Sequence, residues 1–167
     1  MNMQPTHEQL WSWVAEVSDP EIPVLSITDL GIVRAIDWQD GRCEVTITPT
    51  YSGCPAMQVI EANIKAVLQQ HGVAAAVRTV LSPAWTTDWI SDDGRSKLRA
   101  YGIAPPQADA PQPVNASALF ARRDEVVACP QCGSRQTRLI SQFGSTACKA
   151  LYRCTDCLEP FDYFKPH

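Results

Sequence analysis

Apolar positions at helical spacing mark two segments in the first hundred residues. Residues 6–17 place four apolar side chains on one helical face, at positions 10, 13, 14 and 17. Thr6 and Gln9 form a capping-box pattern at the start of this segment. Residues 56–71 carry a longer stripe and end in His71-Gly72, which is typical of a helix C-terminus rather than of a ligand. We therefore predict two amphipathic helices, the second with the apolar face Met57, Ile60, Ile64, Val67 and Leu68.

Alternating apolar and polar positions predict strands. Residues 42–49 alternate in this way, residues 32–38 read as a strand with Val33, Ala35 and Asp37 on one face, and Gln39-Asp40-Gly41 between them is typical of a hairpin turn. Cys43 falls on the apolar face of the second strand, which indicates a buried small hydrophobe. Residues 73–81 form a third, weaker strand, and residues 91–101 form a short helix that Gly102 ends. This order of elements predicts an α+β domain with a small mixed sheet.

A composition change divides the chain. Residues 104–117 hold four prolines among Ala, Gln and Asp, which is typical of an extended linker between domains. We predict an α+β domain over residues 1–103, a linker over residues 104–118 and a small β-rich domain over residues 119–167. The two tryptophans before the linker, Trp85 and Trp89, are expected to pack in the core, with a partner surface as the alternative.

The last domain carries two C-x-x-C pairs, and 21 residues lie between them. The segments 137–143, 150–153 and 161–164 read as short strands around these pairs. The pattern predicts a zinc ribbon, a closed structural Zn²⁺ site that stabilises a domain too small to fold on its core alone. Iron, as a single ion or as a cluster, is the alternative metal. The predicted ligands are Cys129, Cys132, Cys154 and Cys157.

Other features of this last domain fit a thin ribbon core. Cys148 is a fifth cysteine, which we expect to be a bystander; the alternative is a thiol that accepts a transferred group. Aromatic and basic side chains are typical of a ribbon core with solvated charges, although stacking and charge could also serve nucleic-acid binding. These side chains are Phe143, Tyr152, Phe161, Tyr163, Phe164, Arg122, Arg123, Arg135, Arg138 and Arg153.

The loop over residues 50–55, Thr-Tyr-Ser-Gly-Cys-Pro, places Cys54 at the predicted N-terminus of the second helix. Unpaired N–H groups and the positive end of the helix dipole lie there, and both favour the thiolate over the thiol. We therefore expect Cys54 to be a thiolate and to be the functional centre of the first domain. The acids Asp19, Glu21 and Asp29 could act as ligands or bases. Turn and helix-cap roles are the alternative for these acids.

Charge and composition limit the possible functions. The net charge is −4, with −5 on residues 1–103 and +1 on residues 104–167, which argues against nucleic-acid binding. We find no apolar run of 18 residues and no signal-peptide pattern at the start, so we expect no membrane span and a cytoplasmic location. In reducing cytosol, seven cysteines favour metal or thiol chemistry over disulfides. An enzyme with a cysteine nucleophile is disfavoured, because His7, His71 and His167 all lie away from Cys54 in the predicted elements.

Several motifs resemble known families. The chain is similar to the MIP18-like family (also called DUF59), small α+β proteins of iron–sulfur assembly, in Asp19-Pro20-Glu21-Ile22-Pro23, Asp29-Leu30-Gly31-Ile32-Val33 and Thr50-x-x-x-Cys54-Pro55. It also resembles the PaaD family, accessory proteins encoded with phenylacetyl-CoA epoxidase, in Asp88-Trp89-Ile90-Ser91 and in the segments 97–106 and 143–154. Together these resemblances cover nearly the whole chain apart from the linker.

The resemblance implies a maturation role in phenylacetate catabolism rather than an enzyme activity. PaaD-type proteins are associated with iron–sulfur cluster assembly in, or insertion into, the reductase subunit of the epoxidase system, which would be the client. When the family's site residues are transferred to this sequence, Cys54 is a transient ligand for iron or a cluster. Asp19, Glu21, Asp29 and Thr50 take the positions around Cys54, and the four tail cysteines take those of the metal ligands. Because one thiolate cannot hold a cluster alone, Cys54 would share it across a homodimer or with the client.

Two other functions remain open from the sequence. The chain could be a structural subunit that binds other epoxidase subunits without moving metal. It could also be a nucleic-acid-binding zinc ribbon, which the net charge disfavours. The partners expected are therefore proteins of the epoxidase system, with no nucleic acid and no membrane.

Overall fold

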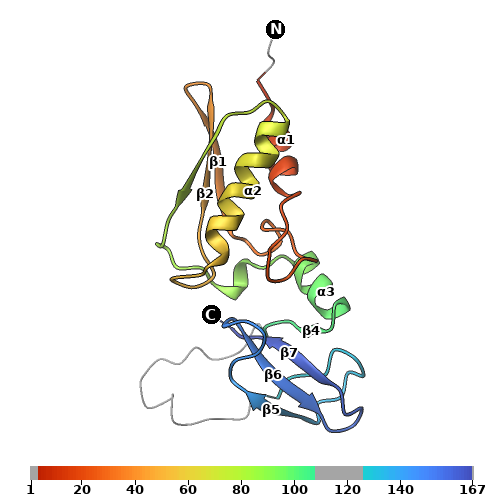
Figure 1. Cartoon of the computed structure of the whole chain (residues 1–167). Coiled ribbons are helices and arrows are strands. Elements are labelled where there is room, and N and C mark those ends of the chain that lie inside the picture. Colours follow the sequence, from red (N-terminus) through yellow and green to blue (C-terminus); the bar gives the residue numbers. More distant parts are fainter. Residues whose placement is uncertain (1–3, 108–125, 167) are drawn as a thin grey trace. The chain divides into compact units, whose positions relative to one another are not determined.

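The computed structural model of the chain describes residues 4–107 and 126–166 (Figure 1). The chain divides into two compact units, Met1–Gly94 and Arg95–His167. Each unit builds its own sheet, with strand orders β1-β2-β3 and β4-β7-β6-β5, so the α+β class is confirmed. The domain limits at residues 103 and 118 stay a prediction, and most of the expected linker lies outside the described residues.

The first unit places two helices against a three-stranded sheet. The helices α1 and α2 contact each other, and α1 and α2 also contact β1 and β3 respectively (Figure 1). A short 3₁₀ helix follows β3, and α3 spans the boundary between the units. The elements are α1 (His7–Val14), β1 (Val33–Gln39), β2 (Arg42–Ile47), α2 (Ala56–Gln70), β3 (Ala75–Thr79), the 3₁₀ helix (Thr87–Trp89) and α3 (Asp92–Ala100).

The first helix begins as predicted but is shorter. The Thr6 hydroxyl accepts a hydrogen bond from the Gln9 N–H (3.2 Å), and the Gln9 side chain accepts one from the Thr6 N–H (2.8 Å), so the capping box is confirmed. α1 ends at Val14 rather than at residue 17. Val17 is still buried, but its carbonyl accepts from the Ile27 N–H (3.0 Å). The apolar pattern continued past the helix because this turn also packs on the core.

The hairpin and the mixed sheet are confirmed. Asp40 and Gly41 both have positive φ (50° and 75°), as a two-residue type I′ turn requires. β1 pairs antiparallel with β2, and β3 lies parallel to β2. A bulge between Val33 and Ala35 lets Val33 and Ile36 both point into the core, which strict alternation would not allow.

The apolar faces of β2 and α2 form much of this core. The expected stripe of α2 is buried at Ile60, Ile64 and Leu68, while Met57 and Val67 stay partly exposed. Trp85 is buried and its indole N–H donates to the Leu30 carbonyl (2.8 Å), which confirms core packing for this tryptophan. The fully buried side chains of β2 are Cys43, Val45 and Ile47.

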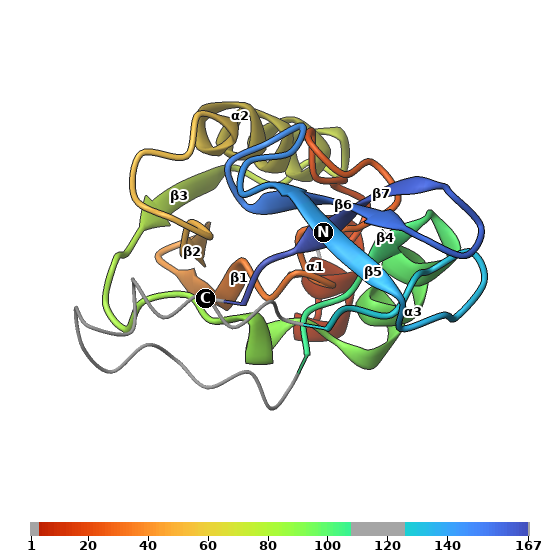
Figure 2. The ribbon, with the colours of Figure 1, turned by 90° about the horizontal axis from the view of Figure 1, so that it is seen from below.

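The second unit is a four-stranded sheet whose strands follow one another in the order β4-β7-β6-β5 in Figure 1; Figure 2 shows the same strands from below. It contains β4 (Ile103–Ala104), β5 (Thr137–Ser141), β6 (Lys149–Cys154) and β7 (Pro160–Phe164). The three strands predicted after the first cysteine pair are confirmed. Sequence reasoning missed β4, which pairs in parallel with residues 162–163 of β7, because two residues beside prolines carry no periodic signal.

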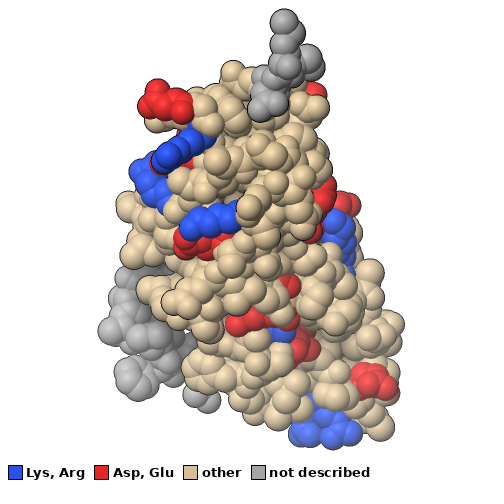
Figure 3. Space-filling view, turned by 45° about the horizontal axis from the view of Figure 1, so that its top comes forward, with Lys and Arg blue, Asp and Glu red and all other residues tan. Residues whose placement is uncertain are grey.

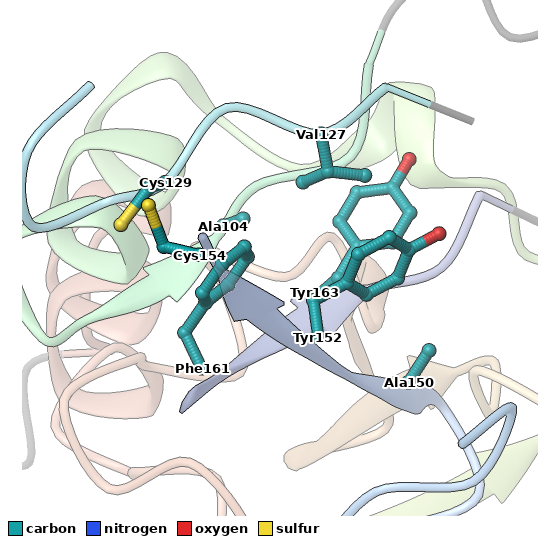
Figure 4. Packing of buried hydrophobic residues seen from close by; sticks show 8 residues of the cluster. All are labelled: Ala104, Val127, Cys129, Ala150, Tyr152, Cys154, Phe161 and Tyr163. Carbon is teal, nitrogen blue, oxygen red and sulfur yellow. The ribbon is translucent and has the colours of Figure 1, made fainter. Parts of the chain in front are cut away.

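Aromatic side chains and cysteines make the core of this sheet. Tyr152, Phe161 and Tyr163 pack together, and the sulfurs of Cys129 and Cys154 lie at one end of the cluster (Figure 4). Among the residues that the structure describes, no helix combines the length and the apolar character needed to cross a membrane.

Candidate functional sites

Cys54 lies in the turn that leads from β2 into α2. Its N–H donates to the Tyr51 carbonyl (3.3 Å), and its own carbonyl accepts from the Met57 N–H (3.4 Å). Pro55 occupies the N-cap of α2 without a side-chain hydrogen bond, so the thiol sits at the helix start as predicted. The side chain is half-buried.

The prediction that this position favours the thiolate is wrong. Burial raises the pKa of the Cys54 thiol above its usual range, and the hydrogen bond from the Ala56 backbone only partly offsets this effect. The negative charges of Glu21 and Asp19 raise the pKa further, whereas a hydrogen bond with the Tyr51 side chain lowers it. The helix terminus is present, but burial and two carboxylates outweigh it.

Two of the predicted acids therefore lie near Cys54. Asp19 is 7% exposed, and its Oδ1 accepts from the N–H groups of Glu21 (2.9 Å) and Ile22 (2.8 Å). This turn fixes the chain beside the thiol, so the structural role that we considered for Asp19 is also present. Tyr51 was missed by sequence reasoning, although it lies only three residues before the cysteine.

Asp29 has a different set of contacts. Its carboxylate accepts from the Ser26 N–H (3.1 Å) and from the Ser91 hydroxyl (3.4 Å), and its carbonyl accepts from the Ser91 N–H (2.9 Å). These bonds brace a loop against the start of α3, which is the structural alternative for this acid. Thr50 is half-buried, three residues after the end of β2 and two residues after the buried Thr48.

The four tail cysteines converge on one point. The Sγ atoms of Cys129 and Cys157 are 3.7 Å apart, those of Cys132 and Cys154 are 3.6 Å apart, and all four lie within 4.8 Å of one another. A tetrahedral ion with Zn–S bonds of about 2.3 Å separates its sulfurs by about 3.8 Å. The site therefore fits a single tetrahedral ion. It fits a four-iron cluster less well, because each cysteine would then bind a separate iron.

The two cysteine pairs form similar knuckles. In the first, the Gly133 N–H donates to the Cys129 carbonyl (2.8 Å), and Gly133 has a φ of 74°. In the second, Leu158 takes the equivalent place with a φ of 66°, and the Cys157 N–H points at the Cys154 sulfur (3.5 Å). That N–H is the main reason why the pKa of Cys154 is lowered to about 7, which favours a thiolate ligand.

Cys148 lies outside the four-cysteine group. It is 4% exposed, and its sulfur is 3.0 Å from the Thr146 hydroxyl oxygen. Four of the five predicted ribbon aromatics are buried, but Phe143 is 66% exposed. Arg122 and Arg123 lie outside the described residues.

Comparisons with known proteins agree with this two-part architecture. Residues 114–165 match the family described as PaaD zinc beta ribbon domain, and residues 7–83 match the one described as iron-sulfur cluster assembly protein. An Escherichia coli (strain K12) protein named as a putative subunit of 1,2-phenylacetyl-CoA epoxidase is 46% identical over 162 residues, which cover 96% of this chain and 93% of that protein.

Two further similarities concern the first part of the chain. The Porphyromonas gingivalis "Fe-S protein maturation auxiliary factor" is 31% identical over 96 residues, covering 56% of this chain and 90% of that protein. A crystal structure of a DUF59 domain of unknown function from Bacillus anthracis is 27% identical, with a TM-score of 0.51, and covers 55% of this chain and 89% of that one. The similarity to the E. coli protein thus extends over both units, whereas these two cover about half of the chain.

Proposed function

The chain belongs to the PaaD family, and from this premise we propose that it is an accessory maturation factor of the phenylacetyl-CoA epoxidase system. In this role it assists assembly of an iron–sulfur cluster in, or its insertion into, the reductase subunit. The observation that carries the proposal is the combination of two similarities in one chain. Nearly the whole chain is similar to a protein named as an epoxidase subunit, and its first half is similar to a protein named as an iron–sulfur maturation factor.

The surroundings of Cys54 support a transient ligand. A half-buried thiol with a raised pKa, flanked by Glu21 and Asp19, is a weak ligand when it is alone. A cluster usually needs four protein ligands, so Cys54 shares its cargo with a second copy or with the client. Weak binding suits a carrier, because the client's own thiolates must replace Cys54 for the cluster to leave.

The tail site has a separate, structural role in this proposal. The four cysteines hold Zn²⁺ in a closed tetrahedron, which leaves no position open for cargo. Cys129 and Cys154 belong to the buried core of the second unit, so the ion also stabilises that core. The spacing of the four sulfurs supports this assignment over a cluster.

A structural subunit of the epoxidase is the second candidate function. The E. coli relative is named as a subunit, and this is the observation that favours it. In that case the protein would copurify with the epoxidase in fixed stoichiometry, and the client's cluster would not depend on Cys54.

Two other functions have little support. His7 contacts Trp11 and His71 stacks on Trp13 with ring centroids 4.2 Å apart, so neither serves as a base for Cys54; His167 lies outside the described residues. Most of the face drawn in Figure 3 is uncharged, and its acidic and basic side chains lie near one another rather than in a basic stripe. Such a surface is poorly suited to nucleic acid.

The test is metal analysis combined with client loading. Wild type, Cys54→Ser and Cys129→Ser/Cys132→Ser proteins are purified without oxygen and examined by elemental analysis and visible absorption. We expect one Zn per chain in wild type and in Cys54→Ser, and loss of Zn in the double variant. The reductase should acquire its cluster with wild type and fail to do so with Cys54→Ser; normal loading with Cys54→Ser would refute the transfer role.

A further inference from the structure

The second unit exposes residues of β5 and β6 on the side of the sheet opposite its aromatic cluster. On β5 and β6 the inward side chains are Leu139 and Tyr152, which pair across the strands and pack in the core. Arg138, Leu151 and Arg153 therefore point to the opposite side, and so does Asp162, the β7 partner of Leu151, whose carboxylate is held by Lys149 and Ser145. We call the exposed part of this side the outer ribbon face; it consists of Arg138, Leu151 and Arg153, together with Ile140, which is exposed at the bulge between Leu139 and Ser141.

Two arginines oppose each other on this face. Arg138 and Arg153 are direct cross-strand partners in the β5–β6 ladder. Side chains at such positions have Cβ atoms about 5 Å apart, and like charges there destabilise the sheet. The Arg153 Nε donates to the Leu158 carbonyl (3.2 Å), and neither arginine forms an ion pair with a carboxylate among the described residues. A carboxylate on a partner would relieve this repulsion.

A further exposed aromatic side chain lies just after β5. Phe143 follows β5 and is 66% exposed, and Ile140 on β5 is 50% exposed. The loop at Phe143 is nevertheless firmly held, because the Ser141 hydroxyl bonds both the Phe143 N–H (3.2 Å) and its carbonyl (2.8 Å). The ammonium of Lys165 lies 4.5 Å from the ring centroid and donates to the Gln142 carbonyl (2.9 Å).

A firmly held, exposed aromatic is well suited to protein binding. Such a side chain loses little conformational entropy when it enters an apolar pocket, and aromatic and Arg side chains dominate binding energies at protein interfaces. The Lys165 ammonium beside Phe143 favours an acidic rim around that pocket, so the rim should carry carboxylates.

The two units also differ in net charge. The sequence of Arg95–His167 holds ten Lys and Arg against six Asp and Glu, a net charge of +4, and that of Met1–Gly94 holds four against twelve, a net charge of −8. The basic unit therefore favours an acidic partner. A nucleic acid would meet the strong negative charge of the first unit in the same chain.

We propose that the outer ribbon face, together with Phe143, is the docking surface for an acidic surface of the client protein, with Phe143 in an apolar pocket and carboxylates beside Arg138 and Arg153. The identity of the client, the reductase subunit, rests on the proposed function. The docking surface itself is distinct from Cys54 and from the four cysteines.

The experiment measures the affinity of the purified full chain for the purified reductase subunit at low and high salt. We expect Arg138→Gln and Phe143→Ala each to weaken binding about tenfold, and the salt dependence to become shallower in Arg138→Gln. Arg138→Gln should not lower the melting temperature, because it removes a like-charge pair. The matched controls are Arg99→Gln and Arg135→Gln, exposed arginines of the same unit that lie outside β5 and β6 and line a hollow with the core residue Val127, and both should bind like wild type.

Several results would overturn this docking surface. Wild-type affinity in both Arg138→Gln and Phe143→Ala would do so, as would equal weakening in the two control variants. If single-stranded RNA displaces the reductase from the protein, the partner of this surface would be a nucleic acid rather than a protein. Cys54→Ser separates the two proposals, since it should bind the reductase normally but fail to load it. If Phe143→Ala fails to bind the reductase but Cys54→Ser loads the reductase normally, the docking surface stands and only the transfer role of Cys54 is refuted.

Discussion

The backbone of Gly31 passes so close to Trp89 that a Cβ on Gly31 would lie 2.5 Å from the Trp89 carbonyl oxygen and 2.7 Å from its Cβ. Gly31 also has a φ of 69°, which side chains rarely adopt. We expect Gly31→Ala to lower the free energy of unfolding by about 3 kcal/mol, from backbone strain and overpacking together. Urea denaturation followed by tryptophan fluorescence measures this loss.

Gly72→Ala is the matched control. Gly72 has a similar φ of 75°, but a Cβ there would meet nothing within 4 Å. Only the conformational cost should remain, about 1 kcal/mol. Equal losses in the two variants would show that contact with Trp89 adds nothing.

Leu158 is strained in the second cysteine knuckle. Its φ of 66° matches that of Gly133 in the first knuckle, and its side chain is 58% exposed, so it contributes little burial. Leu158→Gly should therefore stabilise the zinc-loaded protein by about 0.5–1 kcal/mol, and Gly133→Ala should destabilise it by a similar amount. Thermal denaturation of the zinc-loaded variants checks both signs, and a lower melting temperature for Leu158→Gly would contradict this account.

The pKa of Cys54 can be moved in both directions. Burial and the Glu21 carboxylate raise it, so Glu21→Gln should lower the pKa and speed alkylation by iodoacetamide near neutral pH. Tyr51→Phe removes a hydrogen bond that lowers the pKa and should slow the same reaction. The folded protein is alkylated over a range of pH, and mass spectrometry of the peptide that contains Cys54 then gives the modified fraction at each pH and hence the shift in the pKa. Glu8→Gln on α1 should leave the profile unchanged.

Lys149 is buried in the ribbon beside Asp162. Lys149 is 4% exposed, and its Nζ lies 3.7 Å from Asp162 Oδ2, which also accepts from the Ser145 hydroxyl (3.0 Å). Asp162→Ala should cost about 3 kcal/mol, because it leaves a buried ammonium unpaired. In the Lys149→Met background the same change should cost far less. A double-mutant cycle from chemical denaturation gives the coupling, and additive losses would mean that the two charges do not interact.

Local patterns accounted for much of the fold. Asp40-Gly41 predicted the hairpin because the type I′ turn needs positive φ at both residues, and Thr6 with Gln9 predicted the start of α1 because the capping box is a local interaction. The register of β1 could not be predicted from the sequence. Its bulge at Val33–Ala35 depends on how the strand meets β2 and the core, which no short pattern encodes.

The candidate sites, like the fold, could be predicted only where local sequence patterns determine them. The grouping of the four tail cysteines could be predicted from their spacing, because two C-x-x-C pairs specify their own knuckles. The state of Cys54 was predicted with the wrong sign, because the helix terminus can be read from the sequence, whereas burial and the approach of Glu21 and Asp19 depend on tertiary structure. Tyr51 was missed for the same reason.

The pairing of β4 with β7 has a consequence for how this protein can be divided. Ile103 and Ala104 precede residues 108–125, yet they form an outer strand of the second sheet, and Ala104 contributes to its core. A fragment cut at residue 119 would expose the backbone edge of β7 and lose part of that core. A fragment that keeps the whole second sheet therefore has to include Ile103 and Ala104, on the other side of the proline-rich segment from the cysteines.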